Sequence, residues 1–363
     1  MSLPLATAES TTFRGKTVLV TGATGFLGTR LACRLLREGA RVRVLARSPE
    51  RARRLVEHGA HLVVGDICDE TALRAAVDGA AVIYHLAGRL LVPGVPEAEY
   101  RRVHVQGTRH LLSCCDDAPG LERLVHCSTT GVLGATGERP ADETAAMAPT
   151  SVYELTKAEA EVAVLERCRG GLPAVVARPG LVYGPGDLHL LSFFRLIARR
   201  RFLPIGRRAV LLHPIYLDDL IEALLRCGQD PAAVGECFHL AGRAPVSVAE
   251  LAGTIARAQG TSLPPGHLPL PVARAAASLA QLLPPGLRRH APLTPSRVDL
   301  LTRSRVYDVD KARRLLRFEA PTDLSEGVAL TLEWYRQHGH LPAPACRCPH
   351  VAPVGAVRSG SWS

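Results

Sequence analysis

A glycine-rich turn near the amino terminus restricts the possible folds of this chain more than any other segment. Residues 21–28 read Thr-Gly-Ala-Thr-Gly-Phe-Leu-Gly and directly follow the apolar run Thr17–Val20. A β-branched run that stops at glycine and gives way to the helical pattern of Phe26–Glu38 predicts a buried parallel strand turning straight into a helix. The chain goes on to alternate such strands with helices, which predicts an open α/β sheet.

The same turn predicts a nucleotide-binding site, because phosphate groups bind where a strand turns into the amino terminus of a helix. Gly22 allows the tight turn, Gly25 lets the backbone approach a pyrophosphate, and Gly28 lets the helix pack closely on the strand. The N–H groups of the first helical turn would point at the anion. We expect the cofactor to contact Gly22, Thr24, Gly25, Phe26, Leu27 and Gly28.

The composition excludes several other classes of protein. The chain has 363 residues, enough for two domains, and its 47% hydrophobic content can fill a core. No apolar run approaches the roughly 20 residues that cross a bilayer, and residues 1–12 lack the basic start and apolar centre of a signal peptide. We therefore expect a cytoplasmic protein without an integral membrane segment.

The formal charge of +10 does not indicate a nucleic-acid partner, because the excess is nearly all arginine and is spread along the chain without interleaved aromatic residues. The ten cysteines lie mostly inside apolar segments, where reduced cysteine packs as a small hydrophobic residue, so disulfides are not expected. Cys346, Cys348 and His350 lack the paired spacing of zinc modules, so no metal site is expected there.

The pattern of strands and helices predicts a doubly wound, mainly parallel sheet of the Rossmann type, with a smaller, mostly helical carboxyl-terminal domain that closes over the cofactor. Further strands are predicted at Arg41–Ala46, His61–Gly65, Ala81–Leu86, Arg123–Cys127, Ala174–Arg178, Val210–His213 and Cys237–Leu240. Further helices are predicted at Pro96–Asp116, around Tyr153, at Leu190–Arg201, from Ile215 with Asp218 and Asp219 at its cap, and at Val248–Gln259, Val272–Leu283, Asp308–Leu316 and Leu324–His338. Residues 13–180 and 209–245 would form the dinucleotide-binding domain, 181–208 and 246–341 the substrate-binding domain, and 342–363 a disordered tail.

The ends of the predicted strands favour NADP over NAD. At the end of the second strand an acidic side chain would accept from a free ribose 2′-hydroxyl, whereas an arginine would pair with a 2′-phosphate. This chain has Arg47 there, followed by Ser48, which would donate to the same phosphate. Asp66, after the third strand, either accepts from the adenine amino group or caps the next helix. Other residues at strand ends would line the cofactor crevice, namely Ile67, Leu86, Ala87 and Gly88.

A tyrosine and a lysine four residues apart predict the chemistry. Tyr153 and Lys157 share one face of a predicted helix, and Thr129 follows the strand Arg123–Cys127. A free tyrosine has a pKa of about 10, but a nearby ammonium and an oxidised nicotinamide favour the phenolate, so Tyr153 would become a usable acid or base. Lys157 would supply that charge and hold the nicotinamide ribose, while Thr129 would bind the same substrate oxygen as Tyr153.

Two further segments are open to a functional and a structural interpretation. His104 lies within the predicted helix Pro96–Asp116, and we expect a buried, hydrogen-bonded histidine there rather than a proton shuttle. The segment Val272–Leu283 carries Val272, Ala276 and Leu279 on one face with Arg274 opposite. A helix of this kind docks on a membrane surface or an apolar partner, or else serves as a lid or core helix, which is the interpretation we favour.

Together these motifs resemble the extended short-chain dehydrogenase/reductases, in the group of NAD(P)-dependent epimerases, dehydratases and 3β-hydroxysteroid dehydrogenases. The resemblance runs from about Gly15 to Leu341 and is carried by the glycine-rich turn, Gly65-Asp66-Ile67, His85-Leu86-Ala87-Gly88, Ser128-Thr129, Tyr153-x-x-x-Lys157 and the segment 178–186. It implies Tyr153 as the catalytic acid/base with Lys157 as its partner, and Thr129 in the place of a serine or threonine. It also implies a homodimer, and Pro179 and Val182 beside the cofactor; His104 departs from the usual asparagine.

The predicted function is an NADP(H)-dependent interconversion of a secondary alcohol and a ketone. An apolar pocket built from residues such as Leu90, Leu91, Val132, Leu133 and Tyr183 would take a lipid, steroid or polyketide-like ketone. The segment 300–305 lacks the Arg-x-Gly-Asp-like sequence with which related sugar-nucleotide epimerases hold a diphosphate.

Two alternatives remain at this point. One is a sugar-nucleotide epimerase or dehydratase that keeps NAD bound, with a diphosphate clamp formed by Arg207, Arg288, Arg289, Arg303 and Arg305. The other is a non-catalytic NADPH sensor, which the presence of both Tyr153 and Lys157 disfavours.

Overall fold

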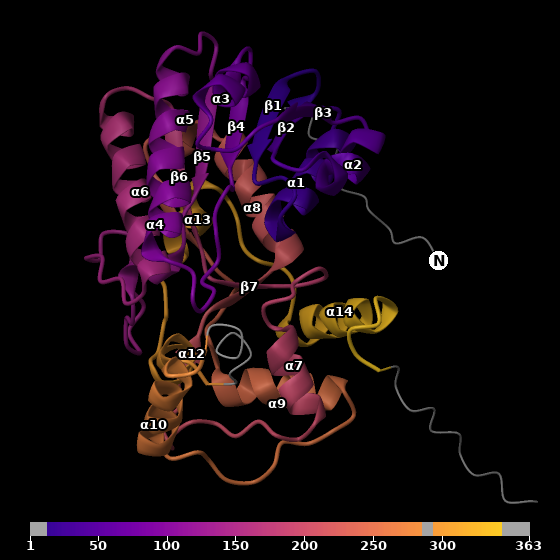
Figure 1. The fold of residues 1–363 in the computed structure, drawn as a ribbon, viewed down its shortest axis with the longest axis vertical. Coiled ribbons are helices and arrows are strands. Elements are labelled where there is room, and N and C mark those ends of the chain that lie inside the picture. The colour runs from indigo at the N-terminus through magenta and orange to yellow at the C-terminus, as the bar shows by residue number, and fades with distance from the viewer. Residues whose placement is uncertain (1–12, 285–292, 343–363) are drawn as a thin grey trace, which may run out of the picture.

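The computed structural model describes residues 13–284 and 293–342. A seven-stranded parallel sheet with helices on both faces forms the larger part, and a smaller, mostly helical part lies below it in Figure 1. This is the α/β architecture that the sequence predicts. The predictions for Arg288, Arg289, Cys346, Cys348 and His350, and for the tail beyond residue 342, concern residues outside the described part.

All seven strands of the main sheet run parallel, in the spatial order β10-β6-β5-β4-β1-β2-β3. The chain builds β1, β2 and β3 outwards and then returns to place β4 on the other side of β1. In open α/β sheets ligands bind at this reversal, outside the carboxyl ends of the strands. The strands are β1 (Thr17–Thr21), β2 (Arg41–Ala46), β3 (His61–Val64), β4 (Val82–His85), β5 (Arg123–Cys127), β6 (Ala174–Pro179) and β10 (Cys237–Leu240).

Helices cover both faces of the sheet because its strands carry apolar side chains on both sides. One face packs against α1 (Phe26–Arg37), α2 (Pro49–Glu57) and α8 (Leu217–Gln229), and the other against α3 (Glu70–Val77), α5 (Gly107–Asp116) and α6 (Val152–Arg169). The helical stretch expected at Pro96–Asp116 is confirmed. It consists of α4 (Glu97–Arg101), the π-helical turn η2 (Arg102–Gln106) and α5.

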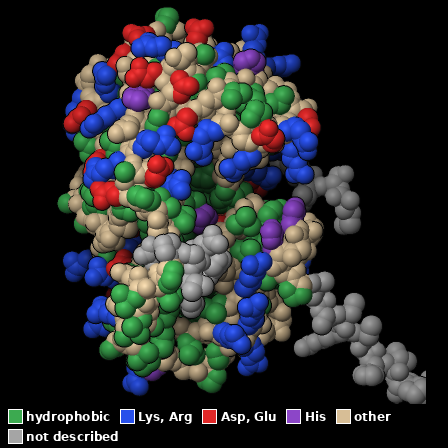
Figure 2. All heavy atoms as spheres, in the orientation of Figure 1, with side chains coloured by type: hydrophobic (Ala, Val, Ile, Leu, Met, Phe, Trp, Pro, Cys, Tyr) green, Lys and Arg blue, Asp and Glu red, His purple; other side chains and the backbone are tan. Residues whose placement is uncertain are grey.

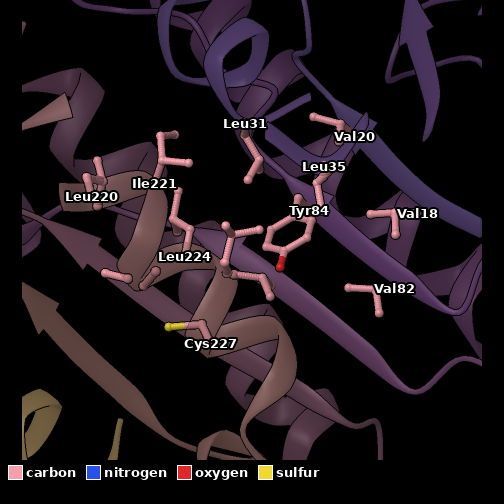
Figure 3. Close-up of a cluster of buried hydrophobic side chains, with 14 of the residues drawn as sticks. Val18, Val20, Leu31, Leu35, Val82, Tyr84, Leu220, Ile221, Leu224 and Cys227 are labelled. Carbon is pink, nitrogen blue, oxygen red and sulfur yellow. The ribbon is translucent and has the colours of Figure 1, made fainter. Parts of the chain in front are cut away.

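The larger core lies between β1, β4, α1 and α8, as Figure 3 shows. Valines from the two strands, such as Val18 and Val82, face Leu31 of α1 and Leu224 of α8, and all of them are buried. Tyr84 stands among them, and its hydroxyl has no hydrogen-bond partner in the described part of the chain. Burial raises the pKa of this phenol. Tyr84 therefore contributes packing rather than polar contacts to the core.

The smaller part has a separate apolar core in which α7, α9 and α14 pack together. It is supplemented by two short strand pairs, in which β7 runs parallel to β9 and β8 antiparallel to β11. Its elements, together with those that link it to the sheet, are η3 (Thr130–Leu133), β7 (Leu181–Tyr183), α7 (Leu191–Ala198), β8 (Leu211–Leu212), β9 (Pro214–Tyr216), η4 (Pro231–Ala233), β11 (Val246–Ser247), α9 (Val248–Ala258), α10 (Leu270–Gln281), α12 (Pro295–Thr302), α13 (Asp310–Leu315) and α14 (Leu324–Gln337).

The prediction of a helix from Ile215 is wrong, because Ile215 belongs to β9, which pairs with β7, and the helix begins at Leu217. Asp218 and Asp219 lie in its first turn and do not cap it. Both carboxylates instead hold distant segments. Asp218 accepts from Arg30 of α1 at 2.5 Å, and Asp219 accepts from the Thr322 hydroxyl at 2.8 Å.

Several other predicted elements are shorter than expected; β4, for example, lacks Ala81 and Leu86, and α13 lacks Asp308, Val309 and Leu316. Two further cases lie near the smaller part. The helix over Leu190–Arg201 ends at Ala198, because Arg200 takes a left-handed conformation with φ 55°. The strand over Val210–His213 is reduced to the two residues of β8. Both differences fall where the chain passes between the sheet and the smaller part, where contacts between segments distant in sequence decide the conformation.

Candidate active site

The turn between β1 and α1 has the close packing that its glycines predict. Gly22 has φ +72°, and a Cβ at this position would lie 2.6 Å from the Ala87 nitrogen, so the turn touches the chain that follows β4. A Cβ on Gly28 would overlap the carbonyl oxygen of Gly22. Only glycine therefore fits at either position. The contact places the glycine-rich turn beside Leu86 and Ala87, at the reversal of the sheet.

The amino terminus of α1 has no cap of its own among the described residues. Gly25 occupies the N-cap position without a side-chain hydrogen bond, and the first turn carries no acidic residue. In contrast, α2, α3 and α6 are capped by the side chains of Ser48, Asp69 and Ser151. Because the first N–H groups of a helix need an acceptor and the helix dipole favours an anion there, α1 fits the pyrophosphate of a dinucleotide.

Arg47 stands at the end of β2 with its side chain 62% exposed and its guanidinium 3.6 Å from the Asp66 carboxylate. Asp66 also accepts from the Cys68 N–H at 3.0 Å and from Arg102 at 3.1 Å. Burial acts to raise the pKa of Asp66, but the Cys68 N–H and the Arg102 guanidinium outweigh it, so the pKa is lowered. Two arginines thus share the Asp66 carboxylate, and Arg102 also lies 3.8 Å from Glu99.

The structure excludes Asp66 as the cap of the next helix. Asp69, rather than Asp66, caps α3, with its carboxylate accepting from the Ala72 N–H at 3.1 Å. Ser48 is also engaged within its own helix, where it caps α2 and donates to Glu50 at 2.6 Å. The side chains of Asp66 and Ser48 are therefore both engaged by neighbouring protein groups.

Thr129 and Tyr153 meet between β5 and α6. Thr129 lies close enough to Tyr153 to act on the pKa of its phenol, and the Thr129 hydroxyl accepts from the Gly131 N–H at 3.1 Å. A capping box formed by Ser151 and Glu154 starts α6 and so fixes the first turn, which carries Tyr153. Local sequence therefore positions the phenol, and the strand that precedes Thr129 supplies its partner.

Lys157 lies one turn further along α6, only 6% exposed, and its Nζ donates to the carbonyl oxygen of Cys127 at 2.5 Å. Burial lowers the pKa of Lys157, and Cys127 and Glu161 act against that shift. Burial likewise raises the pKa of Tyr153, and the nearby Thr129 offsets this only in part. Without a bound nucleotide Tyr153 is therefore protonated at neutral pH, and the ammonium of Lys157 alone does not make it a phenolate.

His104 is a buried and fully hydrogen-bonded histidine, as expected. Its Nε2 accepts from the Arg89 backbone N–H at 2.9 Å, so its proton is on Nδ1, which donates to the Thr156 hydroxyl at 2.8 Å. The ring also meets the Tyr153 ring edge-on at 5.6 Å between centroids. Burial and the charge of Lys157 lower the pKa of His104 to about 3, so the imidazole is neutral. His104 thus ties the loop after β4 to the helix that carries Tyr153.

His85, on β4, continues this buried network. The Thr108 hydroxyl donates to the His104 carbonyl at 2.5 Å, so it accepts from His85 Nε2–H at 3.0 Å. The Thr21 hydroxyl donates in turn to His85 Nδ1 at 2.8 Å. The network extends from β1 through His85 and His104 to α6. It is satisfied only while both imidazoles are neutral.

A buried ion pair under the site was not predicted from the sequence. Glu161 accepts from Arg178 of β6 at 2.5 Å and from the Ser128 hydroxyl at 2.5 Å, and both charged side chains are almost completely buried. Ser128 directly precedes Thr129, so the pair fixes the chain at the predicted site. The one signal in the sequence is the spacing, since Glu161 lies four residues beyond Lys157 on the same face of α6.

The other predicted cofactor contacts lie around the same edge of the sheet. Leu86 and Ala87 adjoin Gly22, and Gly88 faces His104. Pro179 ends β6, with its carbonyl accepting from Thr130 at 3.0 Å, and Val182 is half-buried on β7. Ile67 is buried against Gly107 of α5 and so supports the site from behind. Thr24, Phe26 and Leu27 are half-buried in the turn itself.

Arg102 and His85 are residues of this site that sequence reasoning missed. Arg102 lies 36 residues from Asp66 in the chain, and only the packing of η2 beside the end of β3 brings the two together. His85 falls within a recognised strand-end motif, but its partners Thr21 and Thr108 come from two other elements. Neither contact has a local sequence pattern.

Comparisons with known proteins agree with this geometry. Residues 18–241 match the model of the NAD dependent epimerase/dehydratase family. The chain is 32% identical over 341 residues to a 4-hydroxy-2-methyl-3-oxo-4-farnesyl-3,4-dihydroquinoline-1-oxide ketoreductase of Stigmatella aurantiaca, covering 92% of this chain and 99% of the relative. It is 28% identical to a 2-alkyl-3-oxoalkanoate reductase of Shewanella oneidensis, covering 85% of this chain and 84% of the relative.

Solved structures share the fold. The UDP-glucuronic acid 4-epimerase of Bacillus cereus, solved in complex with NAD, superposes with a TM-score of 0.70 at 22% sequence identity, over 89% of this chain and 99% of the epimerase. The family match spans most of the sheet, and the reductase relatives align over nearly the whole chain. The chain therefore belongs to the NAD-dependent epimerase/dehydratase family of extended short-chain dehydrogenase/reductases, and it is an NAD(P)-dependent oxidoreductase that acts on CH–OH and keto groups.

Proposed function

We propose that this protein is an NADP(H)-dependent ketoreductase that interconverts an apolar ketone and the corresponding secondary alcohol. The observation that carries the proposal is the convergence of Thr129, Tyr153 and Lys157 between β5 and α6, in a sheet whose first helix has an uncapped amino terminus. The three side chains would supply a proton from the positioned phenol of Tyr153, and the uncapped amino terminus of α1 would bind the pyrophosphate of a dinucleotide.

The residues at the end of β2 fit a nucleotide with a 2′-phosphate. The adenosine ribose would meet Arg47, whose ion pair with Asp66 is long and exposed, so releasing the arginine to a phosphate costs little. Asp66 is already occupied by Arg102 and the Cys68 N–H, so it is poorly disposed to accept from a free 2′-hydroxyl. Arg51, whose guanidinium lies 3.5 Å from the Thr24 carbonyl, adds a second cation beside the same turn.

Tyr153 performs the proton transfer in this proposal. In the reducing direction the buried, protonated phenol donates to the substrate oxygen, and Thr129 holds that oxygen in place with a second hydrogen bond. Lys157 would hold the nicotinamide ribose, and its positive charge would stabilise the phenolate that Tyr153 becomes when it has given up its proton. The bound dinucleotide supplies or removes the hydride. In the reverse direction the positive charge of an oxidised nicotinamide favours the phenolate.

Three residues of the predicted apolar pocket, Val132, Leu133 and Tyr183, are instead buried in the cores of the protein, so other apolar side chains support the choice of substrate. Leu90 and Val92, in the loop after β4, are 48% and 42% exposed, and Leu188, in the loop after β7, is 57% exposed. Figure 2 shows the surface hollowed between the two parts of the molecule, with hydrophobic side chains in view there. The printed names of two reductase relatives carry a farnesyl and an alkyl group. An apolar ketone suits such a surface better than a sugar nucleotide.

The first test concerns the nucleotide. The freshly purified protein is denatured, any released nucleotide is identified, and the affinities for NADPH and NADH are compared. We expect an exchangeable site that prefers NADPH, with the preference falling roughly tenfold in Arg47→Ala and unchanged in Arg53→Ala, a control on the exposed face of α2. Tightly retained NAD without a preference for NADPH would contradict the proposal and favour an epimerase or dehydratase.

The second test concerns the phenol. With NADPH and a panel running from alkyl-substituted 3-oxo esters to 3-ketosteroids, Tyr153→Phe should lose activity by roughly 10²- to 10⁴-fold, the range of general acid catalysis. Binding of NADPH, followed by fluorescence, should persist. Tyr335→Phe serves as the control, because the hydroxyl of Tyr335 is buried without a partner in the described part of the chain. Full activity of Tyr153→Phe would exclude Tyr153 as the proton donor.

A further inference from the structure

Helix α10 exposes its large apolar side chains and buries its small ones. Its buried residues are Ala273 and Ala277, which pack on α12 and the loop before β8. Val272 is 52% exposed and Leu279 65%, and Leu282, at the end of the helix, is 81% exposed. In the same part of the molecule α9 has the usual arrangement and buries Leu251 and Ile255. The outer face of α10 is therefore an apolar surface without a partner in the described chain.

Basic residues predominate around this face, and the acid of the neighbouring helix α12, Asp299, is paired with Arg303 and Arg305. No acidic residue occurs between 188 and 217, a segment with six arginines, or between 251 and 298, a segment with five, of which Arg288 and Arg289 lie outside the described residues. Arg274 lies on α10 itself and is exposed. Arg207 and Arg208 lie near the start of α10, because the Gly206 N–H beside them donates to the Leu268 carbonyl and Ile205 packs against the buried face of the helix. Both arginines are exposed. Figure 2 shows hydrophobic side chains where Figure 1 places α10, with basic side chains around them.

An apolar helix face with exposed leucines and surrounding cations, and without acids, has the composition of an interfacial membrane helix. An acidic lipid surface attracts arginines near it, each by roughly fivefold in affinity, whereas a neutral apolar partner gains nothing from them. None of the helices in residues 13–284 and 293–342 is long and apolar enough to cross a bilayer, so contact with lipid would be peripheral.

We propose that the outer face of α10, formed by Val272, Leu279 and Leu282 and flanked by Arg207 and Arg208, docks on the surface of an anionic lipid membrane. The leucines enter the boundary between headgroups and acyl chains, and the arginines remain at the level of the phosphates. This docking does not depend on the proposed reaction. It would, however, bring an enzyme for apolar ketones to the phase in which such substrates are dissolved.

The test is co-sedimentation of the full-length protein with vesicles of phosphatidylcholine alone and of phosphatidylcholine with 30% phosphatidylglycerol. We expect at least tenfold tighter binding to the anionic vesicles, and much weaker binding in 0.5 M salt because charge attraction is screened. Replacing both leucines in Leu279→Ser/Leu282→Ser should weaken binding by tenfold or more, since burial of each leucine contributes about that factor. The matched control is Leu330→Ser, which changes an exposed leucine of α14 and should bind as the unaltered protein does.

Folding of each variant is verified by thermal unfolding, which these exposed substitutions should leave unchanged. A second variant, Arg207→Ser/Arg208→Ser, should keep weak binding to neutral vesicles and lose most of the preference for anionic ones. Absence of binding to either vesicle would overturn the proposal, as would equal binding to both. Self-association by sedimentation velocity that disappears in Leu279→Ser/Leu282→Ser, without vesicle binding, would also overturn it and assign the face to a second copy of the chain.

Discussion

Acid should unfold this protein at a pH well above the range in which carboxylates titrate, because several histidines are buried in their neutral form. His85 provides the clearest case. It is buried between Thr21 and Thr108, and its Nδ1 accepts a hydrogen bond from Thr21, which only the neutral imidazole can do. Burial, the charge of Lys157 and the neighbouring His104 lower its pKa from 6.5 to about 3.

The sign and size of the effect follow from linkage. Between pH 6.5 and about 3 the unfolded chain binds a proton at His85 and the folded chain does not, so stability is present above pH 6.5 and is lost as the pH falls through this window. At pH 5 the loss is about 2 kcal/mol for one such histidine. His104 and His239 also have pKa values lowered to about 3, so the summed loss approaches the total stability of an ordinary domain.

The perturbation is His85→Asn, measured by urea unfolding at pH 7 and pH 5. Asparagine keeps an acceptor for Thr21 but leaves Thr108 without its donor, which should cost about 1–3 kcal/mol at pH 7. Because asparagine does not titrate, the difference in unfolding free energy between the variant and the unaltered protein should be about 2 kcal/mol smaller at pH 5 than at pH 7. Burial raises the pKa of some carboxyls, such as Glu143 and Asp219, and these groups stabilise the folded protein as the pH falls. Their contribution is the same in the variant and in the unaltered protein, so it cancels in the difference.

His61→Gln is the control, because His61 is exposed at the start of β3. Its stability should differ from that of the unaltered protein by the same amount at both pH values. If the difference in unfolding free energy between His85→Asn and the unaltered protein is the same at pH 7 and pH 5, then His85 gains its proton equally in the folded and unfolded states. The assignment of a neutral, doubly bonded imidazole would then be refuted.

Three further substitutions test the packing of the fold. Glu161→Gln should destabilise the protein by about 3–5 kcal/mol in urea unfolding, since it leaves Arg178 buried without its counter-ion. The double variant Glu161→Met/Arg178→Met should recover most of this loss. A cost below about 1 kcal/mol for Glu161→Gln would contradict an ion pair shielded from water. Gly28→Ala should abolish NADPH binding in calorimetry, because its Cβ would overlap the Gly22 carbonyl oxygen, and retained affinity would show that the turn adapts. Tyr84→Phe should be neutral or stabilising by up to about 1 kcal/mol, as its hydroxyl has no partner in the described part of the chain; marked destabilisation would reveal a hidden hydrogen bond.

Local patterns were sufficient to predict the elements of the sheet. The strands at Arg41–Ala46, Arg123–Cys127 and Cys237–Leu240 have the predicted bounds, because continuous apolar runs between turn residues have few alternatives. The glycine-rich turn over Gly22–Gly28 was also predictable from the sequence, because glycine is required there by backbone contacts within the turn and with the end of the neighbouring strand. Tyr153 and Lys157 were recognisable because four residues along a helix return to the same face.

Where the chain passes between the sheet and the smaller part, sequence patterns were less informative. Ile215 was expected in a helix, but its pairing with Val182 places it in β9. Val272 and Leu279 have an amphipathic spacing that does not reveal which face is buried. In the structure the face with Ala273 and Ala277 is the buried one, and it packs in a cluster with Ile205 and Val298.

The sequence by itself determined the alternation of strand and helix, the glycine-rich turn and the spacing of the tyrosine and lysine, because each depends on neighbours within a few residues. Only the tertiary structure decided the protonation states and partners at the site. The Lys157 ammonium points to the Cys127 carbonyl, His104 takes its tautomer from the Arg89 N–H, and Arg102 reaches Asp66. These contacts join residues 15 to 36 positions apart, and burial sets their pKa values, so no local pattern encodes them.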